Sequence, residues 1–293
     1  MKIVLRWVLL GGVIWLLVLA GNSVVMAQSG GQACTREGLK AITDNFFTAL
    51  EAHNPSGLPL AFGAKYTENG LEVAIGKGVW ETAGKTTFKR GMVDTKKCGT
   101  HTQAIIEEKG NPMLYGVRLK IDNEKVSEIE AIVVRGKQVL DVPAILATKD
   151  QDWEVILPPE ERSSRLAMMA AADDYFRLFV KEQKPKVSEL AFSNFCDRWE
   201  NGAQTTKGGT NQGVAMPAHN CSPKGFADMT HGPRRFLVDE ETGVVVVYVL
   251  FNNVWPDFHM FKMRKGYVEW IQAYFEYGKE YKTIGWPPEP ACK

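Results

Sequence analysis

The chain repeats one pattern, and this repeat constrains its fold more than any other feature. Short matches recur in the same order, first at an offset of 130 residues, then of 132, and later of 142. The matched pairs are Leu60–Phe62 with Leu190–Phe192, Glu68–Gly70 with Glu200–Gly202, and Leu119–Val126 with Phe261–Val268. Ordered matches at a nearly constant offset predict two copies of one supersecondary plan.

Each copy begins with an amphipathic helix and continues as strands. The apolar helical stripes are Leu39, Ile42, Phe46 and Leu50, then Leu166, Met169, Phe176 and Val180. The predicted strands are Thr102–Glu107, Leu114–Ile121 and Val126–Val134, then Arg235–Val238, Val244–Phe251, Phe258–Met263 and Tyr267–Phe275. Val244–Phe251 is apolar throughout, which predicts a strand covered on both faces. A helix on a bent antiparallel sheet, twice over, is an α+β plan whose cones offer small-molecule pockets.

The first residues have the pattern of an export signal. Lys2 and Arg6 precede an apolar run, residues 7–20, and small residues follow at Val25 and Ala27. This order is typical of a secretory signal peptide, here cut after Ala27. The alternative is an uncleaved anchor helix, but the run is short for a bilayer span of about 20 residues. We therefore expect a secreted or periplasmic protein without stable membrane insertion.

The domain boundaries follow from the signal peptide and the repeat. We expect the first domain at residues 28–156, a linker at Leu157–Arg162, the second domain at 163–285 and a tail at 286–293. Because the linker has no Gly-Ser tract, we expect the halves to pack as one unit. The net charge of +1 gives no electrostatic case for nucleic acid as a partner. The sequence leaves the oligomeric state open.

Five cysteines follow the predicted cleavage site, and export permits disulfides. Cys196 and Cys221 flank a loop rich in Gly and Thr, and closing it with a disulfide stabilises the fold by about 3 kcal/mol. We expect Cys34 and Cys98 to form the second bridge, which leaves Cys292 free. The alternative joins Cys292 to Cys34.

Several segments together carry a family resemblance. They are Tyr66–Gly70, Asp94–Cys98, Cys196–Gly202, Arg234–Gly243 and Pro256–Lys262. On these residues the chain resembles SnoaL-like proteins of the nuclear transport factor 2-like superfamily, and within it a poorly characterised secreted group with tandem units, best known from fungi. The resemblance implies two cone-shaped, cystatin-like α+β barrel units. The chain departs from that group at Phe258, where the group has a small polar residue, and at Gln272-Ala273, where it has His-Thr.

His259 is the first catalytic candidate. In a strand, Asp257 and His259 lie on one face, so a carboxylate can orient an imidazole that titrates near neutral pH. Such a pair is suited to proton transfer. The alternative is a structural histidine that is hydrogen-bonded within the sheet.

A polar loop before the second sheet supplies further candidates. They are Asp228, His231, Arg234 and Arg235. Loops often carry functional groups, and arginine can hold a carboxylate or enolate through two hydrogen bonds. The alternative is a solvated loop in which Arg234 pairs with a nearby acid.

Ligand-binding candidates come from both copies. Tyr66 and Glu68 could polarise a carbonyl, and Trp270 belongs to an aromatic-rich end of the chain that could stack a planar ligand. However, Glu-Asn-Gly occurs in both copies, which favours a fold signature for Glu68. The spacing of His, Cys and Asp fits no metal motif, and no nucleotide-binding loop is present, so we expect no metal and no cofactor.

These observations predict an exported protein with a small-molecule pocket. It would be a cofactor-free lyase, isomerase or dehydratase acting on a small carbonyl or aromatic compound by acid–base chemistry. The alternative is a non-catalytic ligand-binding or protein-interaction module. We expect the working pocket in the second half, because Val117 in the first half stands where the second has His259, and valine transfers no proton.

The signal peptide leads to a direct prediction. N-terminal sequencing of the exported protein should begin at Gln28, because signal peptidase cuts after a small residue. A mature protein that retains residues 1–27 would show an anchor helix instead.

Overall fold

The structure, a computed structural model, describes most of the chain beyond the predicted signal peptide. The described residues are 34–136, 140–180, 191–211, 214–215, 218–222, 228–277 and 279–287. The predicted signal peptide and Cys292 lie outside them. Within the described ranges, no helix combines the length and the apolar character needed to cross a membrane.

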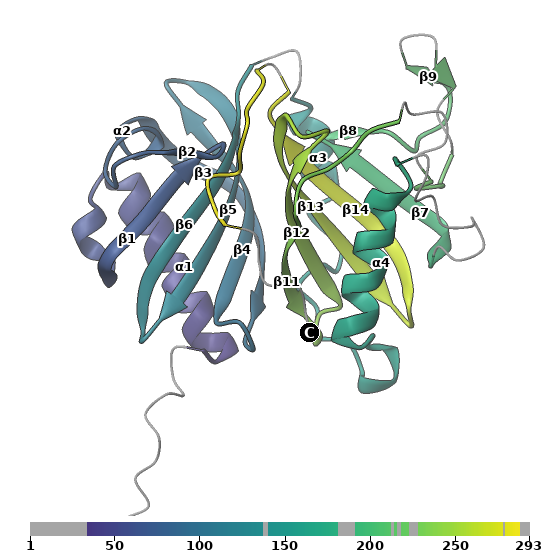
Figure 1. The fold of residues 1–293 in the computed structure, drawn as a ribbon, viewed down its shortest axis with the longest axis horizontal. Helices are drawn as coiled ribbons and strands as arrows, with labels where there is room; N and C mark the ends of the chain where they lie inside the picture. Colours follow the sequence, from purple (N-terminus) through teal and green to yellow (C-terminus); the bar gives the residue numbers. More distant parts are fainter. Residues whose placement is uncertain are drawn as a thin grey trace, which may run out of the picture.

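The first unit is a helix against a curved six-stranded sheet (Figure 1). Helix α1 (Arg36–Glu51) begins after Thr35, whose hydroxyl accepts the N–H of Gly38, and it buries Leu39, Phe46 and Leu50 as predicted. The short helices are η1 (Pro55–Gly57) and α2 (Val79–Thr82). The strands are β1 (Leu60–Glu68), β2 (Leu71–Glu72), β3 (Ala83–Asp94), β4 (Gly99–Glu108), β5 (Asn111–Asp122) and β6 (Lys125–Val134), in the order β2-β1-β6-β5-β4-β3.

The second unit repeats this plan, strand for strand. Helix α4 (Arg165–Arg177) is followed by β7 (Phe192–Glu200), β8 (Ala203–Gln204), β11 (Arg235–Asp239), β12 (Val244–Phe251), β13 (Trp255–Arg264) and β14 (Tyr267–Phe275). Their order, β8-β7-β14-β13-β12-β11, matches that of the first sheet, and β7 runs parallel to β14 as β1 does to β6. The other elements are α3 (Val142–Ala147), η2 (Pro159–Glu161), β9 (Thr210–Asn211) and β10 (Val214–Ala215). The predicted α+β plan, with two sheet units in tandem, is confirmed.

The structure extends the predicted elements and corrects one helical face. Every predicted strand is present, but β1, β3 and β7 were not expected. On α4 the buried face contains Met168, Ala172 and Phe176, at a spacing of four residues. Leu166 lies on the other side of the helix and is 71% exposed, so its placement on the buried stripe was wrong.

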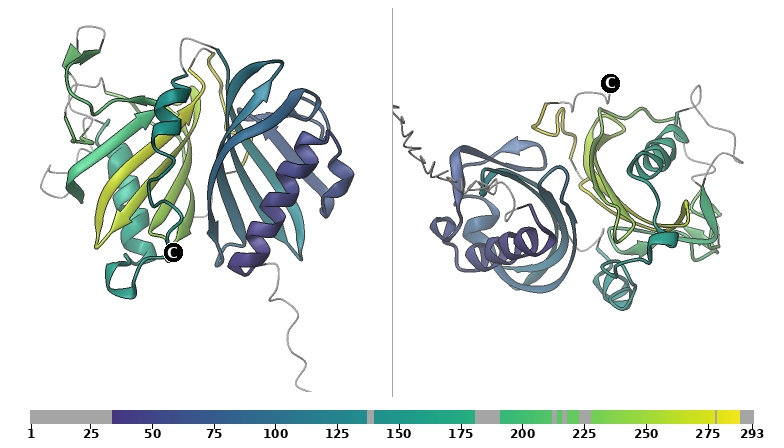
Figure 2. Two further views of the ribbon diagram at one scale, coloured as in Figure 1. Left: turned by 180° about the vertical axis from the view of Figure 1, so that it is seen from behind. Right: turned by 90° about the horizontal axis from the view of Figure 1, so that it is seen from below.

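The two sheets curve around their own helices and turn their convex faces toward each other (Figure 2). Along β12, Val245 and Val247 pack in the core beneath α4, whereas Val246 and Tyr248 pack in a third core between the sheets. Residues of the first sheet, Ile105 among them, complete this third core. The prediction that Val244–Phe251 is covered on both faces is confirmed, because a second sheet lies on the face that a single unit would expose.

A reciprocal pair of ion pairs joins the units. Arg36 starts α1 and binds Asp239 of the second unit, with Nη1 2.9 Å from Oδ2. Arg165 starts α4 and binds Asp94 of the first unit, at 3.0 and 2.6 Å. Asp94 and Asp239 end the equivalent strands β3 and β11, and both are at most 2% exposed. The interface therefore has the two-fold character of a symmetric dimer, although both halves belong to one chain.

The end of the chain returns to the first unit. Lys65 Nζ donates to the carbonyl of Gly285 at 2.5 Å, and the indole N–H of Trp286 donates to Thr67 at 2.8 Å. Gly70, at φ +78°, leaves room for this segment, because a Cβ there would lie 2.0 Å from the carbonyl oxygen of Thr283. Residues 279–287 thus lie against β1 although they follow the second sheet.

The buried ion pairs lead to a stability prediction. Asp94→Ala removes the acceptor for the Arg165 guanidinium and for the backbone N–H groups of Lys96, Lys97 and Val238. We expect a loss of about 3 kcal/mol in the free energy of unfolding, because breaking a buried pair leaves desolvated groups uncompensated. Chemical denaturation measures this loss.

The control is Asp44→Ala, which removes an exposed ion pair with Lys89. It should lower the free energy of unfolding by less than about 1 kcal/mol.

Because the units share a core, wild-type protein should unfold in one calorimetric transition. Two separated transitions, or equal losses in the two variants, would contradict the shared-core interpretation.

Candidate functional site

The candidate site lies on the inner face of the second sheet, beneath α4. Asp257 and His259 both belong to β13 and point to this face, as the alternation of a strand predicts. His259 Nδ1 lies 2.8 Å from Asp257 Oδ1. The two residues are only 2% and 1% exposed, so the pair is removed from bulk water.

Aromatic rings surround the imidazole of His259. Helix α4 contributes Tyr175 and Phe176, whose ring centroids lie 5.2 and 5.1 Å from the imidazole centroid. Phe251 and Phe261 stack nearly parallel to the imidazole at 6.0 and 5.9 Å. The pair therefore stands in a largely apolar, aromatic environment of low effective dielectric constant.

His231 joins this site from the segment before β11. Its ring lies 4.4 Å from that of Phe251 and 5.6 Å from that of Phe176, so His231 and His259 share two aromatic neighbours. The backbone N–H of Asn252 donates to His231 Nδ1 at 3.1 Å. The structure thus brings three of the predicted catalytic residues together.

Burial perturbs the protonation of the site. Desolvation raises the pKa of Asp257, and the neighbouring His259 partly offsets this rise. Burial, together with the charges of Arg234 and His259, lowers the pKa of His231 from 6.5 to about 3. Perturbed titratable groups that converge in one interior are typical of functional sites.

The other predicted catalytic residues lie outside this group. Arg234 pairs with Asp173 of α4 at 2.9 Å and lies over the ring of Phe176, at the edge of the site. Arg235 points to the opposite face, where it donates to Glu128 of the first unit at 3.1 Å. Asp228 is exposed in the segment that leads to β11.

The predicted ligand-binding residues also lie elsewhere. Trp270 projects from the outer face of the second sheet and packs against Trp153, with centroids 5.8 Å apart. Tyr66 is buried in the first unit, where its hydroxyl donates to Glu68 at 2.6 Å. Glu68 also accepts the N–H of Val79, the first residue of α2, at 2.6 Å. Through this contact Glu68 caps the start of α2.

The repeated asparagine has the same structural role in both units. Asn69 exchanges two side-chain hydrogen bonds with the backbone of Val133, at 2.8 and 2.7 Å. Asn201 does the same with Phe275, at 2.9 and 3.0 Å. Both asparagines have positive φ, which asparagine tolerates better than most residues. The repeated Asn-Gly therefore closes the turn after β1 and β7.

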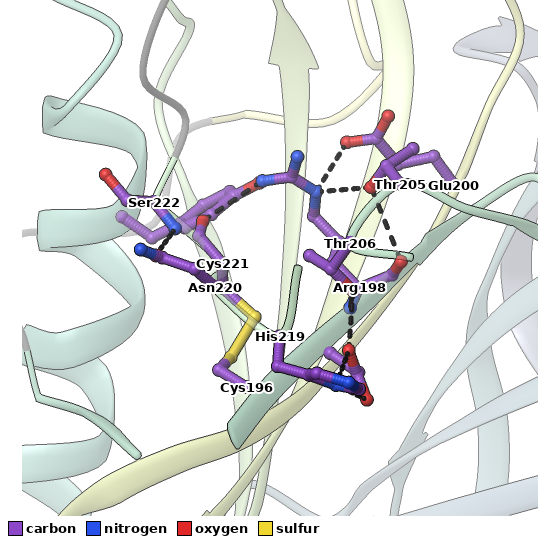
Figure 3. The surroundings of a disulfide bond; sticks show 11 residues. Cys196, Arg198, Glu200, Thr205, Thr206, His219, Asn220, Cys221 and Ser222 are labelled. Atoms are coloured by element: carbon purple, nitrogen blue, oxygen red, sulfur yellow. Dashed lines mark hydrogen bonds and ion pairs between the residues drawn. A yellow bond between two sulfur atoms is a disulfide. The ribbon is translucent and has the colours of Figure 1, made fainter. Parts of the chain in front are cut away.

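Both predicted disulfides are confirmed. Cys34 is joined to Cys98, and Cys196 to Cys221. Figure 3 shows that the second bridge lies beside Arg198, whose guanidinium donates to the carbonyl of Cys221 at 3.1 Å. The bridge thereby fixes the position of a buried cation next to the candidate site.

Arg198 and Tyr175 are the site neighbours that the sequence analysis did not assign. Arg198 Nη1 lies 3.2 Å from the Tyr175 hydroxyl, and Arg198 Nε lies 3.0 Å from Glu200. The motif around Cys196 contained Arg198, but only the unpredicted strand β7 turns it inward. Among the described residues, no three His, Cys, Asp or Glu side chains are grouped to hold a metal ion.

Comparison with known proteins gave a match that covers the second unit. The second unit is similar to one protein family. The family model, described as "Domain of unknown function (DUF8021)", matches residues 161–275. This range runs from η2 through β14 and contains His231, Asp257 and His259. No curated protein matches the chain.

The lowered pKa of His231 predicts an acid sensitivity. The unfolded histidine takes up a proton near pH 6.5, whereas the folded one does so only near pH 3. The contribution of neutral His231 to the free energy of unfolding should therefore be fully present above about pH 6.5. It should be lost as the pH decreases toward 3. His231→Gln should reduce this slope, measured as the free energy of unfolding against pH.

The control is His219→Gln, which replaces a histidine whose side chain is 53% exposed. It should change the slope less than His231→Gln does, because this ring already contacts solvent in the folded protein. Burial also lowers the pKa of His101 to about 3, so part of the acid sensitivity persists in both variants. An unchanged slope in His231→Gln would contradict the assignment.

Proposed function

We propose that the second unit is a SnoaL-like cone that acts on a small carbonyl compound by acid–base chemistry. The observation that carries this proposal is the buried His259–Asp257 pair, 2.8 Å apart on the inner face. By strand register, Val117 and Tyr115 occupy the equivalent positions in the first unit. The second unit alone therefore has a proton acceptor at this point of the sheet.

The pair has defined roles in the proposed reaction. Ionised Asp257 accepts the Nδ1–H of His259, which leaves the lone pair of His259 on Nε2. Nε2 takes a proton from the carbon next to the carbonyl, and the electron pair of that C–H bond forms an enolate. In a β,γ-unsaturated carbonyl compound, return of the same proton to the γ-carbon completes an isomerisation without any co-reactant. Asp257 stabilises the imidazolium between the two steps.

The α+β plan and the disulfides support the proposal at a coarser level. Each unit is one helix in a curved six-stranded sheet, the plan that the family resemblance implies. Two disulfides fit a protein of an oxidising compartment outside the cytosol. Fold alone does not select a reaction, so the inner-face residues carry the functional argument.

A second candidate is ligand binding without turnover. Tyr175, Phe176 and Phe179 from the α4 segment, with Phe251 and Phe261, form an aromatic lining around the pair. Such a lining suits a planar ligand. The two candidates differ in one measurable property, the exchange of carbon-bound protons.

Hydrogen–deuterium exchange tests the proposal. We expect the protein to accelerate exchange of the methyl protons of acetophenone in D₂O, followed by proton NMR. His259→Val, which copies the first unit, should slow this exchange at least about 100-fold, because a general base contributes that much. Val117→Ala, at the equivalent position, should leave it unchanged.

The outcomes separate the candidates. Acetophenone that binds without exchange would support the non-catalytic function. Full exchange activity in His259→Val would overturn the assignment of His259 as the base.

A further inference from the structure

The hydrogen bonds around His231 determine which of its nitrogens carries a proton. The backbone N–H of Asn252 can only donate, so His231 Nδ1, 3.1 Å away, is the acceptor. A neutral imidazole with an accepting Nδ1 has its hydrogen on Nε2. His231 thus presents an N–H donor at Nε2.

His259 has the opposite arrangement. Its Nδ1–H donates to Asp257, so its Nε2 is the accepting nitrogen. Both imidazoles contact Phe176 and Phe251. One interior therefore contains a fixed donor and a fixed acceptor, each held by a protein partner on its Nδ1 side.

The N–H group at His231 Nε2 makes no hydrogen bond within the described part of the chain. Its Nε2 is buried and has no hydrogen-bond partner among those residues. The ring is bordered instead by Phe176, Phe179 and Phe251. An unsatisfied buried N–H destabilises the fold, and a ligand oxygen would satisfy it.

The charges around this interior select against an anionic ligand. Asp257 already places a carboxylate there, with Oδ2 buried and unpartnered among the described residues. The nearby cations have carboxylate partners: Arg234 binds Asp173, and Arg198 binds Glu200. A second buried carboxylate would be desolvated beside a like charge, which is strongly unfavourable.

We propose that His231 is the neutral hydrogen-bond donor to the carbonyl oxygen of the ligand, and that the ligands are uncharged carbonyl compounds. This inference rests on the proposed function, in which His259 is the base. When His259 Nε2 takes the proton, the electron pair of the C–H bond moves into the enolate and its charge develops on the carbonyl oxygen. The N–H of His231 stabilises that charge and remains bonded to nitrogen.

The tautomers can be measured in the unmodified protein. Nitrogen-15 NMR of histidine-labelled protein at pH 7 should show His231 protonated at Nε2 only and His259 protonated at Nδ1. His231→Phe and His259→Val identify the two signals by their loss. A His231 signal from the Nδ1–H tautomer or from imidazolium would overturn the inference without any ligand.

Infrared spectroscopy tests the ligand contact. The carbonyl band of carbon-13 labelled acetophenone should move to lower wavenumber when it binds wild-type protein. In His231→Phe, bound acetophenone should lose this shift. The control Asn253→Ala removes the Asn253–Thr230 hydrogen bond that ties the same segment to the turn after β12, and it should keep the shift.

The affinities of a charged and an uncharged ligand test the proposed ligand class. Benzoate, similar in shape but anionic, should bind at least about tenfold more weakly than acetophenone, a difference of about 1.4 kcal/mol. Equal affinity, or a carbonyl shift that persists in His231→Phe, would overturn the inference and leave the role of His259 intact. If neither probe binds, the proposed function itself fails, whatever the NMR result for His231.

Discussion

The packing of the two convex sheet faces is the constraint on which the rest of the molecule depends. Asp94 and Asp239 are buried at the ends of equivalent strands, and each is bound by the first arginine of the other unit's helix. A buried carboxylate requires its partner, so these two neighbouring ion pairs fix the relative position of the units where β3 meets β11. The outer face of each sheet is buried in this way, and the chemistry that we propose is therefore on the inner face beneath α4.

Most of the sheet could be predicted because its strands are long and apolar, and β12 is the clearest case. The parallel strands β1 and β7 escaped prediction because each has an irregular pairing with an exposed phenylalanine, Phe62 or Phe195, which breaks the alternation. The His259–Asp257 pair followed from the two-residue period of a strand. The face to which Arg235 points could not be predicted in the same way. Arg235 is the first residue of β11, and the direction of its side chain depends on where that strand begins.

The two copies show which residues the fold needs and which it can change. Asn69 and Asn201 make the same backbone contacts, and Glu68 and Glu200 follow the same register. At positions that face the interior the copies differ: Val117 corresponds to His259, and by the same register Tyr66 corresponds to Arg198. The turn-closing residues are repeated, whereas the inner lining is apolar and phenolic in one unit and ionisable in the other.

The return of the chain to its first unit sets the order in which this protein can reach its native state. Trp286 packs against Lys65 and Arg118 of the first sheet and against Arg235 of the second, although it follows both sheets in the sequence. Chains emerge from the ribosome N-terminal end first, at about 5–20 residues per second. The first unit is therefore made early but completes its surface only after the second sheet has been synthesised. A chain that stops before residue 279 leaves β1 uncovered, so the first unit cannot reach its full native surface on its own.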